Sequence, residues 1–285
     1  MPSGFRPWPV ALALALLGCP PSAGDDTEAP DSDDTGAHSA GIVAEPVLHV
    51  DDGPGDLDLT ADGLLLIVTR YGGDVRSWSP QSGAEDVVQH AIPDLEGIFR
   101  AADDRLWAAS SDGQVEGSVG WIEHNDYEEI TDQADDGTLM RGLDDVVLAD
   151  DGTLIAVDDI MEGLFLTDPG SGSTAFVPLA IDYPQALLLH DGALLVAGND
   201  GVYRVSLPDG GATRLDERAG RGLALWGSTI LASNTTDGIY AVGGAIAGGG
   251  EIPSPRNLLA VGDTLYVSDA AGYDLYAMDL SGWVP

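Results

Sequence analysis

A short strand–turn–strand unit that recurs along the chain restricts its fold more than any other feature. Its clearest copy lies at residues 185–207 (Q-A-L-L-L-H-D-G-A-L-L-V-A-G-N-D-G-V-Y-R-V-S-L). Three apolar runs of strand length are separated by Asp-Gly pairs, which favour tight hairpin turns because glycine accepts positive φ angles. A unit this small cannot bury its own faces, so each copy must pack against neighbouring copies.

Five further copies align with this one at the turn before the second strand, at irregular intervals of about 35–50 residues. The six second strands are expected at residues 64–69, 105–110, 153–158, 193–198, 229–234 and 264–269. A third strand carries an aromatic residue at a matching depth in Phe165, Tyr203, Tyr240 and Tyr276, and Trp121 and Trp78 continue this series. We expect these rings to pack between neighbouring copies.

Six four-stranded copies of this length predict an all-β, six-bladed β-propeller over residues 46–285. Outer strands are expected at residues 86–90, 174–180 and 212–215, with weaker candidates at residues 128–131 and 243–247. The last copy lacks an outer strand, whereas residues 47–50 (V-L-H-V) form a spare strand before the first copy. We therefore predict that this N-terminal strand completes the last blade and closes the ring.

The first 18 residues have the pattern of a signal peptide. Arg6 precedes an apolar run over residues 10–17, which is too short to span a hydrocarbon layer of ~30 Å. The run ends in L-L-G-C, which resembles a bacterial lipobox, and Cys19 is the only cysteine of the chain. We predict acylation of Cys19, with palmitate or a similar chain, and extracytoplasmic anchoring in a lipid bilayer. Pro20 favours the outer membrane over the inner one, since many proteins retained in the inner membrane have Asp there.

Residues 19–45 predict a disordered acidic linker, because they combine low hydrophobicity with like charges and contain no Lys or Arg. The whole chain has 48 acidic residues against 11 basic ones, all arginines. This balance excludes nucleic-acid binding, which needs basic residues to neutralise phosphates, and it favours a solvated monomer.

Charged and amide side chains gather where the first strands of the copies begin. Counting back from each turn gives the pairs 55–56, 96–97, 144–145, 184–185, 220–221 and 256–257. Because the first strands of a propeller line its central channel, these side chains are expected to converge on one mouth. Oxygen ligands in such a ring suit Ca²⁺, and the candidate metal ligands are Asp56, Glu96, Asp144, Asp145 and Asn257. Gln185, Arg221 and Arg256 are expected at the same channel mouth.

The D-G-x-L-x-V-x-D cadence, the blade length and the six copies resemble the NHL-repeat and regucalcin/gluconolactonase-like propellers. In the hydrolytic branch of that group, a Glu opening one blade and Asn, Asn and Asp opening later ones hold a divalent metal that polarises a lactone carbonyl. Glu96 in L-E-G-I-F is similar to the opening Glu. The family spacing then reaches Gln185, Arg221 and Arg256–Asn257, and an arginine is a poor metal ligand because its fixed charge repels the cation.

We therefore expect a binding module for a small molecule, a glycan or a protein, and keep a divalent-metal-dependent lactonase or esterase as the alternative. No serine-hydrolase elbow, Walker loop or dinucleotide fingerprint occurs in the sequence. The acidic connection at residues 125–141 has two interpretations, a solvated surface excursion or a loop that binds a cation over one end of the ring.

Overall fold

The computed structural model describes residues 42–90, 92, 94–111, 116–123 and 126–285. The predicted signal peptide, Cys19 and most of the acidic linker lie outside the described residues. All helices and strands assigned in the described part are β-strands. No helix long and apolar enough to cross a membrane occurs among these residues.

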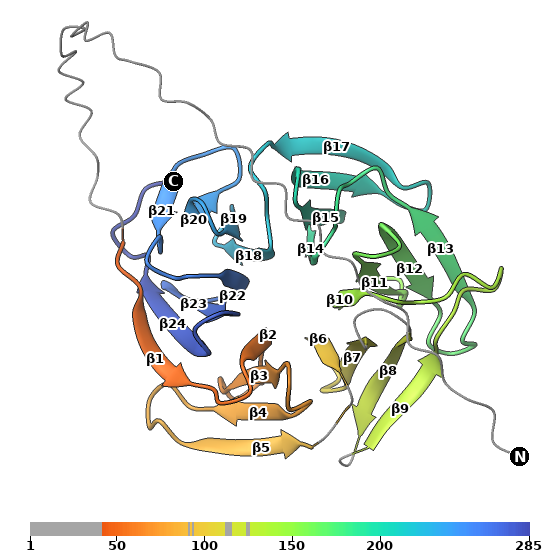
Figure 1. Ribbon diagram of the computed structural model, residues 1–285, viewed down its shortest axis with the longest axis horizontal. Helices are drawn as coiled ribbons and strands as arrows, with labels where there is room; N and C mark the ends of the chain where they lie inside the picture. The colour runs from red at the N-terminus through yellow and green to blue at the C-terminus, as the bar shows by residue number, and fades with distance from the viewer. Residues whose placement is uncertain (1–41, 91, 93, 112–115, 124–125) are drawn as a thin grey trace, which may run out of the picture. The chain divides into compact units, whose positions relative to one another are not determined.

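Six four-stranded antiparallel sheets, the blades, follow one another around a ring, as the repeats predict (Figure 1). The inner strands are β2 (Pro54–Leu59), β6 (Leu95–Arg100), β10 (Leu143–Leu148), β14 (Ala186–His190), β18 (Gly222–Trp226) and β22 (Pro255–Val261). The second strands are β3 (Leu65–Thr69), β7 (Leu106–Ser111), β11 (Leu154–Asp158), β15 (Ala193–Gly198), β19 (Thr229–Asn234) and β23 (Thr264–Asp269).

The third and fourth strands lie progressively farther from the centre of the ring (Figure 1). The third strands are β4 (Val75–Trp78), β8 (Gly117–Glu123), β12 (Gly163–Thr167), β16 (Gly201–Ser206), β20 (Gly238–Ala241) and β24 (Asp274–Asp279). The outer strands are β5 (Glu85–Gln89), β9 (Asp126–Thr131), β13 (Thr174–Pro178), β17 (Gly211–Asp216), β21 (Ile246–Gly248) and β1 (Glu45–His49). All five outer strands proposed from the sequence are confirmed, including the two weaker candidates.

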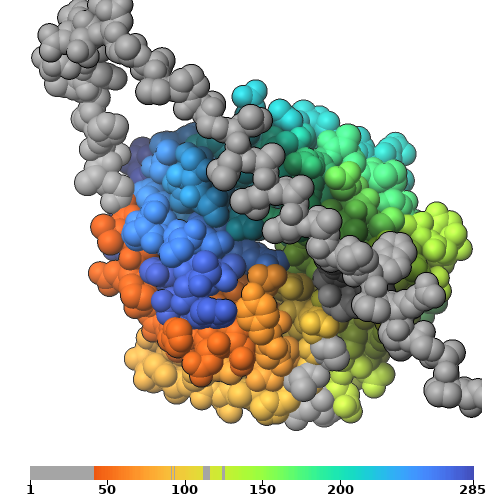
Figure 2. Space-filling model, viewed as in Figure 1, coloured from red at the N-terminus to blue at the C-terminus, as the bar shows by residue number. Residues whose placement is uncertain are grey.

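The ring closes through β1, which pairs antiparallel with β24 as the outer strand of the last blade. The N-terminal strand and the last strand of the chain lie side by side in the space-filling view (Figure 2). Closure extends beyond β1, because Ile42 pairs with Gly248 in the fifth blade and the amide of Ala44 donates to Glu251. The N-terminal segment therefore joins the last two blades and covers the edge of β24.

Aspartates and asparagines at the ends of second strands hold the turns that follow. Asp158 Oδ1 accepts the backbone amides of Ile160 and Met161, at 3.0 and 2.8 Å. Asn234 and Asp269 do the same for the turns after β19 and β23. The terminal Asp of the D-G-x-L-x-V-x-D cadence is thus a turn-capping residue, which explains its recurrence without any ligand.

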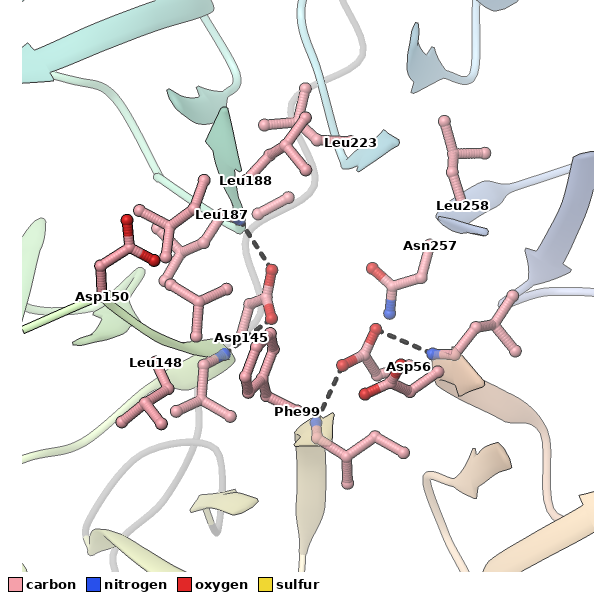
Figure 3. A pocket seen from close by; sticks show the side chains of 17 residues that line it. Asp56, Phe99, Asp145, Leu148, Asp150, Leu187, Leu188, Leu223, Asn257 and Leu258 are labelled. Carbon is pink, nitrogen blue, oxygen red and sulfur yellow. Dashed lines mark hydrogen bonds between the residues drawn. The ribbon is translucent and has the colours of Figure 1, made fainter. Parts of the chain in front are cut away.

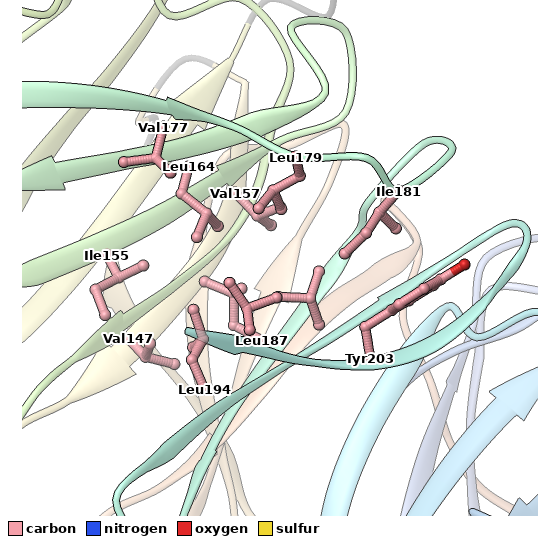
Figure 4. Close-up of a cluster of buried hydrophobic side chains, with 12 residues drawn as sticks. Val147, Ile155, Val157, Leu164, Val177, Leu179, Ile181, Leu187, Leu194 and Tyr203 are labelled. Carbon is pink, nitrogen blue, oxygen red and sulfur yellow. The ribbon is translucent and has the colours of Figure 1, made fainter. Parts of the chain in front are cut away.

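Apolar side chains fill the space between neighbouring blades. The cluster between the third and fourth blades joins Val147, Val157 and Leu164 with Leu187 and Val196 (Figure 4). Leu164, Val157 and Val196 are 0% exposed, so the space between these two blades is closed to solvent. Truncating a Leu of such a cluster to Ala costs about 2–5 kcal/mol, so the packing between blades contributes substantially to stability.

The aromatic series of the third strands is confirmed in four blades and wrong in two. Phe165, Tyr203, Tyr240 and Tyr276 stand opposite equivalent residues of their second strands. In the second blade Gly120 occupies this position, because a side chain there would collide with the carbonyl of Glu128. Trp121 lies one residue further along and packs edge-on against Trp107. In the first blade Arg76 takes the position expected for Trp78.

From residue 126 on, the acidic segment at residues 125–141 is mostly exposed to solvent, as the first interpretation expected, but it is neither a long connection nor a loop over one end of the ring. Its first part is the outer strand β9, and a short turn with a bridge between Gln133 and Leu139 leads to the third blade. Asp135 Oδ2 accepts the hydroxyl of Ser173 at 2.6 Å, and Met140 is 0% exposed. The turn is therefore fixed against the third blade instead of extending over the ring.

Candidate functional site

Candidate functional residues lie where the inner strands begin. At the start of β2, β6, β10 and β22 the pairing with the second strand shifts, for example between Leu143 and Asp145. Such an irregularity interrupts the strict alternation of side chains along a strand. Consecutive residues therefore reach different levels of the channel: Asp144 lies among the charged side chains at its end, whereas Asp145 lines a pocket further along the inner strands.

We call the first level the mouth. It consists of Gly55, Glu96, Asp144, Gln185, Arg221 and Arg256, one residue from each blade. The second level consists of Asp56, Gly97, Asp145, Ala186, Gly222 and Asn257. In the fourth and fifth blades, the pairs expected from the sequence, 184–185 and 220–221, begin one residue too early. The structure gives 185–186 and 221–222, because Ala186 pairs with Ala197 and Gly222 with Ser233. The five predicted metal ligands are thereby divided between two levels.

Arg256 holds the mouth together. Its Nη2 lies 3.1 Å from Oε2 of Glu96 and also donates to Oδ1 of Asp144, which joins three blades. The side chains of Arg256, Glu96 and Asp144 are 11%, 17% and 9% exposed. A largely buried ion-pair network of this kind fixes the side chains in place more than it adds stability.

Three mouth residues were missed by the sequence analysis. Arg70 makes two parallel contacts with Glu96, at 3.1 and 3.2 Å, while Asp159 and Tyr183 lie beside Asp144. Arg70 and Asp159 each follow the last residue of a second strand. Counting one residue forward from each second strand would have found both of them, but no sequence pattern marks Tyr183.

Burial changes the ionisation of the mouth. Burial raises the pKa of Asp144 well above its ordinary value, and Asp159 and Glu96 raise it further, although Arg256 opposes them. A hydrogen bond with Asp159, followed by burial, raises the pKa of Tyr183 to about 12. The surroundings of Asp144 therefore favour its neutral form more than those of an exposed carboxyl group would.

Two mouth side chains retain hydrogen-bond donors. Among the described residues, the guanidinium of Arg221 bonds only to the hydroxyl of Ser254, at 3.0 Å, and it has no carboxylate within 4.0 Å. Burial, together with Arg256 and Arg70, lowers its pKa. Gln185 is 8% exposed, and its side-chain amide bonds to no described residue. Neither side chain has a fully buried N or O atom that lacks a partner, so these free N–H donors are accessible to a ligand.

The second level opens into a cavity of about 350 Å³, the channel pocket (Figure 3). Its polar lining consists of Asp56, Asp58, Asp145, Asp150 and Asn257, and leucines of several blades form much of its wall. Leu148, Asp150 and Leu189 place its other limit at the far ends of β10 and β14. Glu96, Asp144 and Arg256 do not line it, so the pocket and the mouth are separate sites.

A divalent cation does not fit the mouth. Arg256 lies between Glu96 and Asp144, and Arg221 stands at a further position where the resemblance implies a metal ligand. No group of three or more His, Cys, Asp or Glu side chains in the described part of the chain is arranged to hold a metal ion. Asp56, Asp145 and Asn257 lie at the other level, so the predicted ligands do not form one coordination shell.

No protein-family model matches the chain, and no curated protein matches it in sequence. Solved structures match in fold. A structural-genomics target described as a gluconolactonase is 20% identical, with a TM-score of 0.67, over 84% of this chain and 92% of that one. A gluconolactonase from Xanthomonas campestris is 14% identical, also with a TM-score of 0.67, over 83% of this chain and 89% of that one.

A virginiamycin B lyase from Staphylococcus aureus is also similar, at 13% identity and a TM-score of 0.55, over 80% of this chain and 82% of that one. The structural neighbours thus include gluconolactonase-like six-bladed propellers, which confirms the predicted fold. Hydrolases and a lyase share this architecture, so the fold does not determine the reaction.

Proposed function

We propose that this chain is a binding module that recognises a small organic anion at the mouth of its propeller. The observation that carries the proposal is Arg221, a guanidinium without a carboxylate partner among the described residues. Gln185, at the equivalent position of the preceding blade, adds a buried amide with free donors. Together they offer N–H groups on two adjacent blades.

A carboxylate is the chemistry that these donors suit best. A guanidinium binds a carboxylate through two parallel hydrogen bonds, and a side-chain amide can donate a further one. Arg256 and Arg70 neutralise Glu96, while the raised pKa of Asp144 reduces the repulsion that a second anion would meet. In a chain with so many acidic residues, the mouth is therefore a local site for negative charge.

The proposal includes the membrane anchor expected from the sequence. The thiol of Cys19 would carry the acyl chains, and residues 20–44 would connect the propeller to the bilayer. The module would then work outside the cytoplasmic membrane, with the outer membrane as the favoured location. A tethered, rigid ring of this kind suits capture of a ligand close to the membrane surface.

The second candidate is a metal-dependent lactonase or esterase. The gluconolactonases among the structural neighbours favour it. The occupation of the mouth by Arg256 argues against it, because the guanidinium takes the carboxylate oxygens that a cation would need. We therefore keep hydrolysis as an outcome of the test.

The test uses the chain from Pro20 to Pro285, without signal peptide and lipid, and isothermal calorimetry with gluconate, lactate and citrate. We expect saturable binding of at least one carboxylate. The charge-assisted hydrogen bonds of Arg221 predict an affinity loss of roughly 10-fold or more in Arg221→Gln. Arg204→Gln, at an exposed position of β16, is the matched control and should bind as the natural chain does.

Hydrolysis is measured in parallel as acid release from gluconolactone, with Ca²⁺ and with a chelator. Calcium-dependent hydrolysis in the natural chain would favour the second candidate. Equal carboxylate affinity in Arg221→Gln, or no binding of any of the three carboxylates at about 10 mM, would contradict the anion site.

A further inference from the structure

The channel pocket combines an apolar wall with carboxyl groups, and the anion site does not use it. Figure 3 shows Asp56, Asp145 and Asn257 directed toward the same space, which Leu188 and Leu223 approach from neighbouring blades. Its volume of about 350 Å³ lies within the range of small-molecule pockets. Apolar walls with a few convergent polar groups are typical of binding sites.

The two central carboxylates have structural roles that leave acceptor capacity unused. Asp56 Oδ1 accepts the amide of Leu57 at 2.8 Å, and its Oδ2 accepts the amide of Ile98 at 2.8 Å. Asp145 bonds in the same way to Val146 and Leu187, at 2.6 and 2.7 Å. Each oxygen accepts one N–H, whereas a carboxylate oxygen offers two lone pairs. Further acceptor sites therefore remain at both residues.

Asn257 has no such structural role. It is only 8% exposed, and its side-chain amide forms no hydrogen bond with any residue that the structure describes. Its side chain points into the pocket (Figure 3). The amide atoms are not fully buried, so they remain accessible from the pocket and can bond to a ligand. Its orientation toward the pocket therefore indicates a polar ligand group there.

The negative charge of the side chains that line the channel pocket indicates which class of ligand it can bind. Asp56, Asp58, Asp145 and Asp150 line the pocket, and none of its lining residues, all in the described part, is basic. Arg256 and Arg100 act on Asp56 and Asp58 from outside the lining, but their hydrogen-bonded carboxylate partners are other residues, Glu96 and Asp144 for Arg256 and Asp104 for Arg100. A hydrated metal ion needs oxygen ligands on several sides, but leucines occupy much of this wall.

We infer that the channel pocket binds an organic ammonium ion, whose N–H groups bond to Asp56, Asp145 and Asn257 while its hydrocarbon part packs against the leucines. This site differs from the proposed anion site in position and in charge preference. The chain would thus have a second ligand site, for an amphiphilic amine.

The test uses the chain from Pro20 to Pro285 with benzylammonium as the probe and benzyl alcohol as its neutral counterpart. Binding is followed by NMR chemical-shift titration. We expect saturable binding of benzylammonium, with a dissociation constant of about 1 mM or below, and at least roughly 10-fold weaker binding of benzyl alcohol. Asp145→Asn should weaken benzylammonium binding by about 10-fold or more, because it removes one charge from the ion pair.

Two further variants keep the test decisive if Asp145→Asn unfolds. Leu188→Phe reduces the cavity without changing a charge and should abolish binding. Asp62→Asn, at an exposed turn outside the pocket, should bind as the natural chain does. Arg221→Gln should also retain benzylammonium binding, which separates this site from the proposed function.

Three results would overturn the inference: equal affinity for benzylammonium and benzyl alcohol, complete displacement of benzylammonium by millimolar Ca²⁺, or unchanged binding in Leu188→Phe. Equal affinity would show that the carboxyl groups are not engaged. Displacement by calcium would show an inorganic cation site. Unchanged binding in Leu188→Phe would place the probe outside the pocket.

Discussion

Aspartate has different roles in this protein according to its place in the repeat. At the end of a second strand, Asp158 and Asp269 accept the amides of the following turn. At the second level of the channel, Asp56 and Asp145 each accept a backbone amide from the inner strand of the next blade. At the mouth, Asp144 bonds to Arg256. The same side chain therefore caps a turn, joins blades or forms an ion pair, depending on its neighbours.

The buried carboxyl groups predict an inverted dependence of stability on pH. Burial raises the pKa of Asp56 to about 7, although the amides of Ile98 and Leu57 lower it; Asp58 raises it and Arg256 lowers it. The pKa of Asp145 is raised mainly by burial and next by Asp56. A folded state with raised carboxyl pKa values binds more protons than the unfolded chain, so its stability falls as the pH rises from about 4 to about 7.

We therefore expect a lower melting temperature at pH 8 than at pH 5, measured by calorimetry on the chain from Pro20. Asp56→Asn should show a smaller decrease over this interval, since it cannot ionise. Asp62→Asn, at a residue whose pKa is lowered by a hydrogen bond from Thr60, should keep at least the full decrease. An identical decrease in Asp56→Asn and in the natural chain would exclude Asp56 as a source of the pH dependence.

Among the elements, β1 closes the ring although it comes first in the chain. It completes the last blade, and Val50 directly after it is 0% exposed in a cluster with Leu57 and Tyr266. Three residues before β1, the backbone amide of Ile42 donates to the carbonyl oxygen of Ala247, at 2.8 Å. Without this segment the edge of β24 would be unpaired, and an unpaired edge promotes association between chains.

This role predicts different outcomes for two truncations. A chain that begins at Ser39 retains all of these contacts and should melt as the chain from Pro20 does. A chain that begins at Asp51 lacks β1 and should melt at a clearly lower temperature and form dimers or aggregates, as measured by thermal unfolding and size-exclusion chromatography. Equal melting temperatures and a monomeric profile for both chains would mean that β1 neither stabilises the folded state nor protects the edge of β24.

For the whole molecule, the net charge limits how the protein could associate with a membrane. The formal net charge is −37, and the acidic residues outside the pockets keep the surface solvated. A strongly acidic protein is repelled by anionic lipid head groups, so any stable membrane association must come from a different source. The predicted acyl chains on Cys19 would supply it, because each buried methylene contributes about 0.8 kcal/mol.

The corresponding prediction concerns the full-length chain in a bacterial cell. The natural chain should sediment with membranes, whereas Cys19→Ser should appear in the soluble extracytoplasmic fraction. Ser22→Ala, three residues further along, should remain with membranes and serves as the control. Sedimentation of Cys19→Ser at the level of the natural chain would show that acylation is not the anchor.

The repeats alone were sufficient to predict the scaffold. Strand length, Asp-Gly turns and the count of six copies are local features, and a blade with apolar faces on both sides has few ways to bury them. Even ring closure followed from a simple count, because one copy lacked a strand and residues 47–50 offered one. These features are encoded within a few residues of one another, so no tertiary information was needed.

The site depended on the tertiary structure. A shift in pairing at the start of the inner strands separates Asp144 from Asp145. Gln185 and Arg221 were expected at the mouth from the sequence, but the pairing of β14 and β18 assigns them to the first level instead of the second. Arg256 meets Glu96 only because the ring brings residues 160 positions apart into contact. Irregularities of one residue and contacts across a closed ring leave no periodic signal, so the sequence determined the architecture, whereas folding decided which charges meet.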